Sequence, residues 1–531
     1  MAMLRGVLSA LLVVSGLALP AAASPRATID AMRGQPATQW QGIVVDLNLV
    51  GAYYGDPANS MIWVRDGRPT QAANDLFEAI KLAREDGLNE DDYATTALTL
   101  PELFESDKDI AGFELVMSQA FLAFARDLHS GQTIRAATAA DIVVSRKPID
   151  PAAWLTLARD KGVSAAIEKL RPRHPQYFQL REMLMGYRAV AERGGWPTVD
   201  QGPSLKPGMQ DSRVGQMRAN LKARGYGGLD ASDVNHYDDG MVAVVRHFQE
   251  RHGLEADGVA GPATVAAVNV TAKQRIRQIM VNMERWRWLP NDLGSRHVFV
   301  NQAGFELFLN NGGQTVAHHP VIVGKPFHKT PVFSEKISYV EFNPTWTATN
   351  SIATNEILPE LQKDPGYLEK NDYVLYRGWD ENAVVVDPWS VDWQSVSVKG
   401  FPYRIVQKPG AKNALGQIKF MFPNKFDIYM HDTPSRQLFA KTGRAFSHGC
   451  IRVHEPVRFA EELFGLDGSL TPDEIESLIE AGQTKRVNLK TKVPVHLTYF
   501  TVWIDEDGTP NFFPDLYDRD ELVTRLLSGE V

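Results

Sequence analysis

The stretch HVFVNQAGFELFLNNGGQTVAHHPVIVG, residues 297–324, decides the fold of the C-terminal part of the chain. Upstream, between Thr271 and Trp286, apolar residues recur about every four positions, as in a helix. Within the stretch they alternate or form short blocks between glycine and asparagine turns, which is typical of β-hairpins. Further strands are expected at residues 336–342, 419–430 and 493–504. The sequence therefore predicts a β-rich domain over residues 296–505, followed by a C-terminal tail at 506–531.

A second pattern interrupts these strands. Residues 351–399, which include NEILPELQKDPGYLE, are more helical in character. We expect this segment to be an insertion that caps the β-rich domain.

Upstream of the β-rich domain the chain is predicted to be helical, so the fold class is α+β and multidomain. Helical stripes that end at glycines indicate a helical scaffold domain over residues 26–200. A linker, GPSLKPG, leads into three short helices over residues 203–270, and a connecting helix follows at 271–295. The aromatic residues of the scaffold are interpreted as core, and no catalytic cluster is found there.

The three-helix segment contains fixed turn residues: Phe248-Gln249, Gly253-Leu254, Asp257-Gly258 and Gly261-Pro262-Ala263-Thr264. Pro262 stands where proline favours the start of a helix. The pattern resembles the peptidoglycan-binding three-helix module of bacterial wall enzymes. The alternative is a spacer bundle without a ligand.

The first residues predict export. Arg5, an apolar run from Val7 to Leu19 and the small residues Ala21-Ala22-Ala23 resemble a secretory signal peptide over residues 1–23. The run is shorter than the ~20 residues of a membrane-spanning helix. We therefore expect a periplasmic protein, with an uncleaved inner-membrane anchor as the alternative. A net charge of −8 gives no basic excess that would indicate nucleic-acid binding.

Cys450 is the only cysteine among 531 residues, within AFSHGCIRVHEP, residues 445–456. It cannot form a disulfide within its own chain. A free thiol is mostly protonated at neutral pH, so a nucleophilic cysteine requires a nearby base. His431 is expected at the end of a preceding strand and is the better base, because His448 lies only two residues from the thiol. Gly449 would let backbone amides point at an oxyanion. The alternative is an inert buried thiol.

A histidine, fifteen residues, and then Ser-His-Gly-Cys with an arginine two positions further closely resemble the signature of the L,D-transpeptidases, the YkuD-type catalytic domain. Residues 407–424 and 430–440 also look like the large multidomain branch of that family. The resemblance implies Cys450 as nucleophile and His431 as base. It implies orienting or oxyanion roles for Asp432, through its main-chain carbonyl, and for Ser447, His448 and Gly449. Arg452, Tyr429 and Asn413 are candidates for substrate binding, and Phe420 is a weaker candidate for lining the cleft.

The resemblance further implies a reaction without a cofactor on peptidoglycan. Cys450 would attack the carbonyl of the third residue of a tetrapeptide stem, release D-alanine, and pass the acyl group to an amine of another stem. Water or a protein amine as acceptor stays open, as do a periplasmic activator, other wall-synthesis partners and the oligomeric state. Two other classes remain: a zinc site using His448, Cys450, His454 and His431, and a wall-binding scaffold without catalysis.

Overall fold

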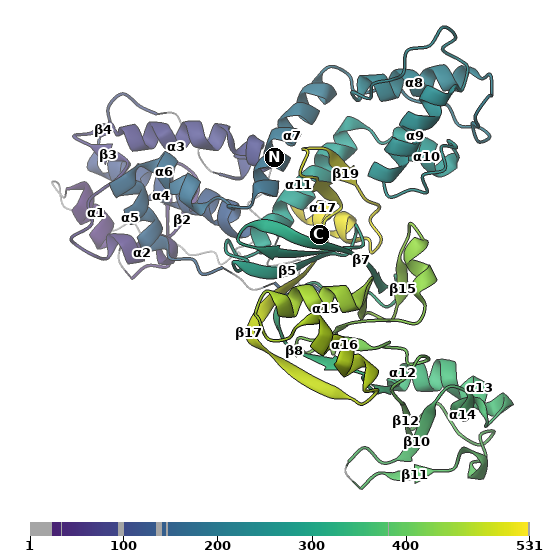
Figure 1. Cartoon of the computed structure of the whole chain (residues 1–531). Coiled ribbons are helices and arrows are strands. Elements are labelled where there is room, and N and C mark those ends of the chain that lie inside the picture. Colours follow the sequence, from purple (N-terminus) through teal and green to yellow (C-terminus); the bar gives the residue numbers. More distant parts are fainter. Residues whose placement is uncertain are drawn as a thin grey trace.

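A computed structural model describes residues 24–32, 34–93, 100–133, 141–144, 147–380 and 382–528. The predicted signal peptide at residues 1–23 lies outside these ranges. Figure 1 shows the N-terminal domain on one side of the molecule, the three-helix bundle on the other, and the insertion projecting from the β-rich domain. No described helix combines the length and the apolar character that crossing a membrane requires.

The N-terminal domain packs around one long helix, α4 (Asp107–Ser130), which is buried on nearly all sides. Thr70 caps α3 (Gln71–Lys81) by accepting a hydrogen bond from the Ala73 amide. The other elements are α1 (Pro25–Ala31), β1 (Ala37–Trp40), β2 (Ile43–Asp46), α2 (Leu47–Tyr54), β3 (Val64–Arg65), β4 (Arg68–Pro69), α3 (Gln71–Lys81), α5 (Pro151–Lys161) and α6 (Val163–Leu170).

Helix α7 (Pro175–Glu192) departs from the predicted scaffold, because it packs against α11 (Ala272–Trp288) rather than into the core of the N-terminal domain. Its partners in that second core include Phe299 and Phe500 of the β-rich domain. Together, α7 and α11 form the helical junction between the domains.

The bundle consists of α8 (Ser212–Ala223), α9 (Asp239–Arg251) and α10 (Pro262–Val268) around its own core. The buried Gln249 explains the spacing of the turn residues. Its amide donates to the side chains of Asp257 and Thr264, and its carbonyl oxygen accepts the Gly258 amide at 2.8 Å. One side chain thus holds the turn and the start of α10 in place.

The β-rich domain is a nine-stranded sheet in the order β15-β7-β16-β14-β13-β8-β17-β5-β6. Since β6 also pairs with β7, the sheet closes on itself around an apolar core. The strands are β5 (Arg296–Asn301), β6 (Glu306–Asn311), β7 (Gln314–Gly324), β8 (Phe333–Phe342), β13 (Ile418–Met421), β14 (Met430–His431), β15 (Ala445–Ser447), β16 (Ile451–Val453) and β17 (Lys485–Thr498). Helices α15 (Pro456–Gly465) and α16 (Pro472–Glu480) complete the domain.

Two predicted strands are broken in the structure. The strand expected at 419–430 is divided into β13 and β14, because the Asn424 side chain accepts the amides of Phe426 and Ile428 in a turn. The strand expected at 493–504 is divided into the end of β17 and β18 (Val502–Ile504), which pairs with β19 (Pro510–Phe512).

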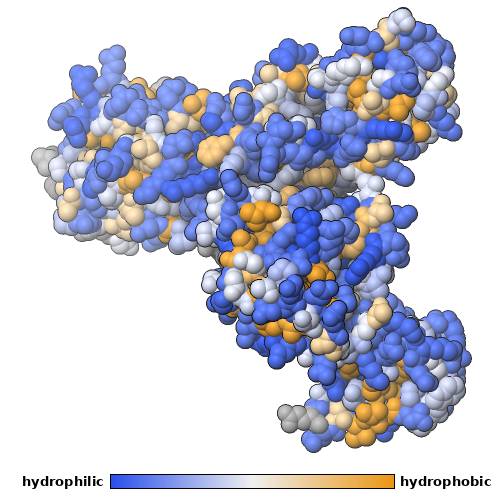
Figure 2. Space-filling model, in the orientation of Figure 1, coloured by the Kyte–Doolittle hydropathy of each residue, from blue (hydrophilic) through white to orange (hydrophobic). Residues whose placement is uncertain are grey.

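The insertion is larger and less helical than predicted. It contains α12 (Asn350–Ile352), a π-helical turn (Ala353–Ile357), α13 (Leu358–Lys363) and α14 (Tyr367–Lys370) beside a four-stranded sheet. The strands of that sheet are β9 (Trp346–Thr347), β10 (Tyr373–Arg377), β11 (Val384–Val386) and β12 (Tyr403–Gln407). The prediction of a mainly helical insertion was wrong, because its sheet pairs strands up to about 60 residues apart in sequence, such as β9 and β12. Figure 2 shows apolar surface over this lobe, whose exposed large apolar side chains include Trp379, Val384, Val385 and Trp389.

The prediction of a C-terminal tail was also wrong, because the described residues after 505 are packed into the fold. Beyond β19 it forms α17 (Arg519–Ser528), and Arg519 is buried. Arg519 donates to the Asp141 carboxylate and to the Thr330 carbonyl oxygen at 2.9 Å. These contacts join the C-terminal helix to Asp141 and to the loop between β7 and β8.

Candidate active site

Strand pairing brings the two predicted loops together. Strand β14 runs parallel to β16, with Met430 opposite Ile451 and His431 opposite Arg452. Met430 and Ile451 are fully buried in the domain core. Because side chains alternate along a strand, His431 and Arg452 project from the other face. The Ile451 amide donates to the Tyr429 carbonyl at 3.1 Å, which sets Cys450 beside Tyr429 on that same face.

Lys419 lies on the same face as His431, Cys450 and Arg452, and the sequence did not single it out as a site residue. It lies opposite His431 on β13, and its ammonium is 4.2 Å from the centre of the Tyr429 ring. Only the strand register reveals it, since nothing in the local sequence around Lys419 distinguishes it from other lysines. We call Lys419, Tyr429, His431, Cys450 and Arg452 the thiol face.

The Cys450 thiol is half-buried. Burial raises its pKa to about 11, although the Tyr429 backbone and hydroxyl and the charges of Lys419 and Arg452 act in the opposite direction. Its Sγ lies 3.8 Å from the Asp427 carbonyl oxygen. The thiol is therefore protonated at neutral pH before substrate binds.

His431 is buried and neutral. Its pKa is lowered to about 3, mainly by burial and then by the positive charges of Arg452 and Lys419, against the Asp432 carbonyl, which raises it. Its Nδ1 lies 2.5 Å from the Asp432 main-chain oxygen. A carbonyl only accepts, so Nδ1 carries the hydrogen and Nε2 carries the lone pair. This is the tautomer that a base requires at Nε2.

The Ser447–Cys450 loop is held by a chain of hydrogen bonds. The Ser447 hydroxyl donates to the Cys450 carbonyl at 2.5 Å and accepts the Gly449 amide at 3.1 Å. Gly449 has a φ of +116°, a conformation that favours glycine. Its amide is thus already occupied, contrary to the expectation that it points at an oxyanion. Among the described residues, the Cys450 amide has no protein acceptor and is the free donor at this position.

A support behind this loop was not predicted. The Thr330 hydroxyl donates to the Gly449 carbonyl at 2.7 Å and accepts the Gly324 amide at 2.9 Å. The hydroxyl of Tyr517, which lies between β19 and α17, donates to the Gly324 carbonyl at 2.6 Å. Two of these pairs are more than a hundred positions apart in the sequence, so no local motif could include them.

The His448 ring contacts Glu356 and His328. Its Nε2 lies 2.7 Å from a carboxylate oxygen of Glu356, in the π-helical turn of the insertion, and its ring is 4.7 Å from that of His328. This contact links the insertion to the residue two positions before Cys450. Burial lowers the pKa of His448, while Glu356 raises it.

The other candidates have different surroundings. Arg452 has no hydrogen-bond or ion-pair partner among the described residues, and its buried Nε is unsatisfied. Asn413 is buried, donates to the carbonyls of Pro344 and Lys408, and accepts the Leu415 amide, so its polar atoms hold its loop against Pro344. Phe420 is fully buried against Phe459 in the core. Asp432 accepts the Gln417 amide with its carboxylate.

The described residues contain no group of three His, Cys, Asp or Glu side chains arranged to hold a metal ion. The zinc interpretation therefore gains no support from this geometry. His454, one of its members, stacks edge-on against Phe439 at 5.0 Å.

Three families match separate parts of the chain. Residues 48–184 match a family described as "Scaffold domain", residues 210–268 one described as "Putative peptidoglycan binding domain", and residues 295–493 the "L,D-transpeptidase catalytic domain", YkuD. A curated protein of Haemophilus influenzae, named "Putative L,D-transpeptidase", is 34% identical over 255 residues, or 48% of this chain. Those residues are 49% of that protein, so the chain spans about half the length of the curated relative it matches.

Solved structures of L,D-transpeptidases are more distant. The protein from Stackebrandtia nassauensis is 14% identical, with 59% of this chain and 99% of that chain covered at a TM-score of 0.22. The protein from Mycobacterium smegmatis is 12% identical, with 38% and 58% covered at a TM-score of 0.18. On the family matches, residues 295–493 belong to the L,D-transpeptidase catalytic domain family, joined in this chain to a scaffold domain and a peptidoglycan-binding domain.

Proposed function

We propose that this protein is a periplasmic peptidoglycan L,D-transpeptidase in cell wall biogenesis, with Cys450 as nucleophile and His431 as base. The observation that carries the proposal is the thiol face. It holds a thiol, a neutral imidazole with its lone pair on Nε2, and two cations on one side of adjacent strands.

The proposed first half-reaction forms a thioester. The Cys450 sulfur attacks the carbonyl carbon of the third residue of a tetrapeptide stem while His431 Nε2 takes the thiol proton. The Cys450 amide donates to the developing oxyanion. The bond to the terminal D-alanine then breaks, and His431 returns the proton to the leaving amine.

In the second half-reaction an amine of another stem attacks the thioester. The amine loses a proton to His431, the carbon–sulfur bond breaks, and the sulfur takes the proton back. When the acceptor is the side-chain amine of a third residue, the product is a 3-3 cross-link. Lys419 and Arg452 are placed to bind a carboxylate of the donor stem, since neither has a carboxylate partner among the described residues.

The test is incubation of the protein with purified tetrapeptide muropeptides and identification of products by mass spectrometry. We expect dimers joined between third residues. Cys450→Ala is expected to abolish them while leaving the thermal unfolding midpoint within a few degrees of the parent, and unchanged turnover would remove Cys450 as nucleophile. Tripeptide alone would assign a carboxypeptidase with the same site.

A further inference from the structure

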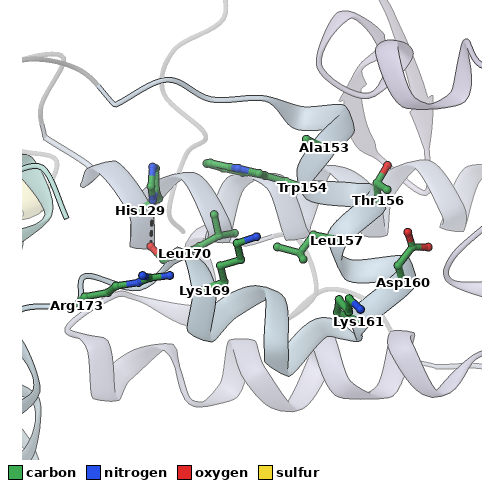
Figure 3. A pocket seen from close by; sticks show the side chains of 10 residues that line it. All are labelled: His129, Ala153, Trp154, Thr156, Leu157, Asp160, Lys161, Lys169, Leu170 and Arg173. Carbon is green, nitrogen blue, oxygen red and sulfur yellow. Dashed lines mark hydrogen bonds between the residues drawn. The ribbon is translucent and has the colours of Figure 1, made fainter. Parts of the chain in front are cut away.

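The N-terminal domain contains a cavity that is separate from the thiol face. It has a volume of about 470 Å³, within the ~300–1,000 Å³ of ordinary ligand sites. Helices α5 and α6 form most of it, and His129 at the end of α4 closes one end (Figure 3). Its lining residues are His129, Ala153, Trp154, Thr156, Leu157, Asp160, Lys161, Lys169, Leu170 and Arg173.

The cavity combines an apolar floor with a cationic rim. Trp154 and Leu170 are buried and Leu157 is half-buried, and the Trp154 ring is fixed edge-on against His129 at 5.3 Å. The His129 Nδ1 in turn lies 3.1 Å from the Leu170 carbonyl oxygen. In Figure 3 the Lys169 side chain extends across the middle of the cavity, with Arg173 toward one end and Lys161 toward the other.

The three cations have no carboxylate partner within the described part of the chain, although the protein carries a net charge of −8. The nearby Asp160 forms its close ion pair with Arg159 at 2.7 Å, and the charge of Lys161 acts on it more weakly. A concave surface with an apolar floor and three cations that lack a salt-bridge partner favours a ligand that carries both carboxylates and apolar or sugar surface.

We propose that this cavity binds carboxylate-bearing glycopeptide of the wall polymer. Stem carboxylates would pair with Lys161, Lys169 and Arg173, and alanyl methyl groups or a sugar ring would rest on Trp154 and Leu157. The choice of ligand rests on the proposed function, and the site itself rests on the cavity. It would hold the polymer at the N-terminal domain, in addition to the three-helix bundle.

The first test is lysine footprinting of the full chain, carrying Cys450→Ser so that the ligand is not consumed. An amine-reactive acetylating reagent is applied with and without a disaccharide tetrapeptide at a concentration that saturates calorimetric binding. We expect acetylation of Lys161 and Lys169 to slow severalfold, while Lys108, an exposed lysine in the first turn of α4, reacts at an unchanged rate. Unchanged rates at Lys161 and Lys169 would overturn the proposal.

Two further probes define the ligand class. A muropeptide with amidated carboxylates should protect much less, and equal protection would contradict a carboxylate site. Inorganic phosphate at the same concentration should not protect, and full protection by phosphate would replace the glycopeptide with a general anion site. If the tetrapeptide protects Lys161 and Lys169 but the protein with its native Cys450 shows no transpeptidation, the proposed function is contradicted and the binding site in the cavity stands.

Charge variants give an independent readout. Lys169→Met with Arg173→Met should weaken binding of the tetrapeptide at this site about tenfold, because two contacts with stem carboxylates are lost and both are screened by solvent. Lys108→Met is the matched control and should bind as the parent does. Turnover of a short soluble stem peptide should stay within twofold in both variants, and unaltered binding in the double variant would contradict the proposal.

Discussion

At the scale of single residues, the proposed chemistry depends on two pKa values displaced in opposite directions. The pKa of Cys450 is raised to about 11 and that of His431 is lowered to about 3, with burial as the largest cause of both shifts. The resting pair is neutral, so the proton moves only when a substrate carbonyl is in place. This differs from a cysteine that is already a thiolate before substrate binds.

This pair predicts the pH dependence of thioester formation. The base form of His431 is lost only as pH falls through about 3, and the thiol proton only as pH rises through about 11. We therefore expect kcat/KM to stay level between about pH 5 and pH 9 in a stopped-flow assay of D-alanine release. An imidazole of ordinary pKa, ~6.5, would instead make kcat/KM fall about fivefold between pH ~6.5 and ~5.5.

Lys419 allows a second residue-scale prediction. Lys419→Met removes one of the two cations on the thiol face and should lower kcat/KM for a stem with a free carboxylate by about tenfold, the usual cost of a lost charge-assisted hydrogen bond. The same variant should discriminate less against a stem whose carboxylates are amidated. Lys485→Met, at an exposed position of β17, is the control. Equal losses for both substrates would mean that Lys419 acts on the fold or the thiol rather than on the carboxylate.

These residues also show what the sequence can predict. Cys450 and His431 could be named because their spacing forms a signature whose chemistry requires both. Lys419, Thr330 and Tyr517 could not, because strand pairing and a packed C-terminus bring them to the site. Asn413 was also a candidate, yet its side chain is occupied by hydrogen bonds with Pro344 and Leu415.

At the scale of elements, the His448 imidazole joins the catalytic loop to the insertion through its contact with the Glu356 carboxylate. Glu356 lies in the π-helical turn, and its partner His448 lies in the loop that ends at Cys450. Such a turn is common at functional positions of helices. The helical part of the insertion was predicted from local periodicity, whereas its sheet depends on pairing between β9 and β12 across the whole lobe.

Glu356→Gln should therefore loosen the insertion. Because Glu356 is about half exposed, the pair contributes roughly 0.2–1 kcal/mol, so we expect KM for tetrapeptide to rise about twofold to fivefold with a smaller change in kcat. Hydrogen exchange in residues 350–363 should become faster. Glu360→Gln, which breaks the Glu360–Lys363 pair within the same lobe, is the matched control. An effect of equal size in both variants would show that the His448 contact is not a link to the site.

At the scale of the whole molecule, the domains are joined by buried contacts rather than by linkers alone. Arg287 on α11 donates to the Asp86 carbonyl and to the Tyr177 hydroxyl, and Glu284 accepts the Thr133 amide at 2.8 Å. On the other side, Arg251 of α9 pairs with Asp505, and His252 stacks near Phe512. The order of domains could be predicted from composition and turns, but these buried contacts join residues that lie too far apart in the sequence.

The bundle permits the last prediction. Deletion of residues 205–270 should reduce recovery of the protein with purified sacculi severalfold, since the bundle matches a peptidoglycan-binding family, and should leave turnover of soluble tetrapeptide within twofold because the thiol face lies in another domain. Arg251→Ala in the full chain is the control: it removes the pairing with Asp505 but keeps the bundle, so binding to sacculi should persist. Equal recovery with and without the bundle would reduce it to a spacer. Lost turnover after deletion, with retained turnover in Arg251→Ala, would mean that the bundle is needed for the catalytic domain to fold.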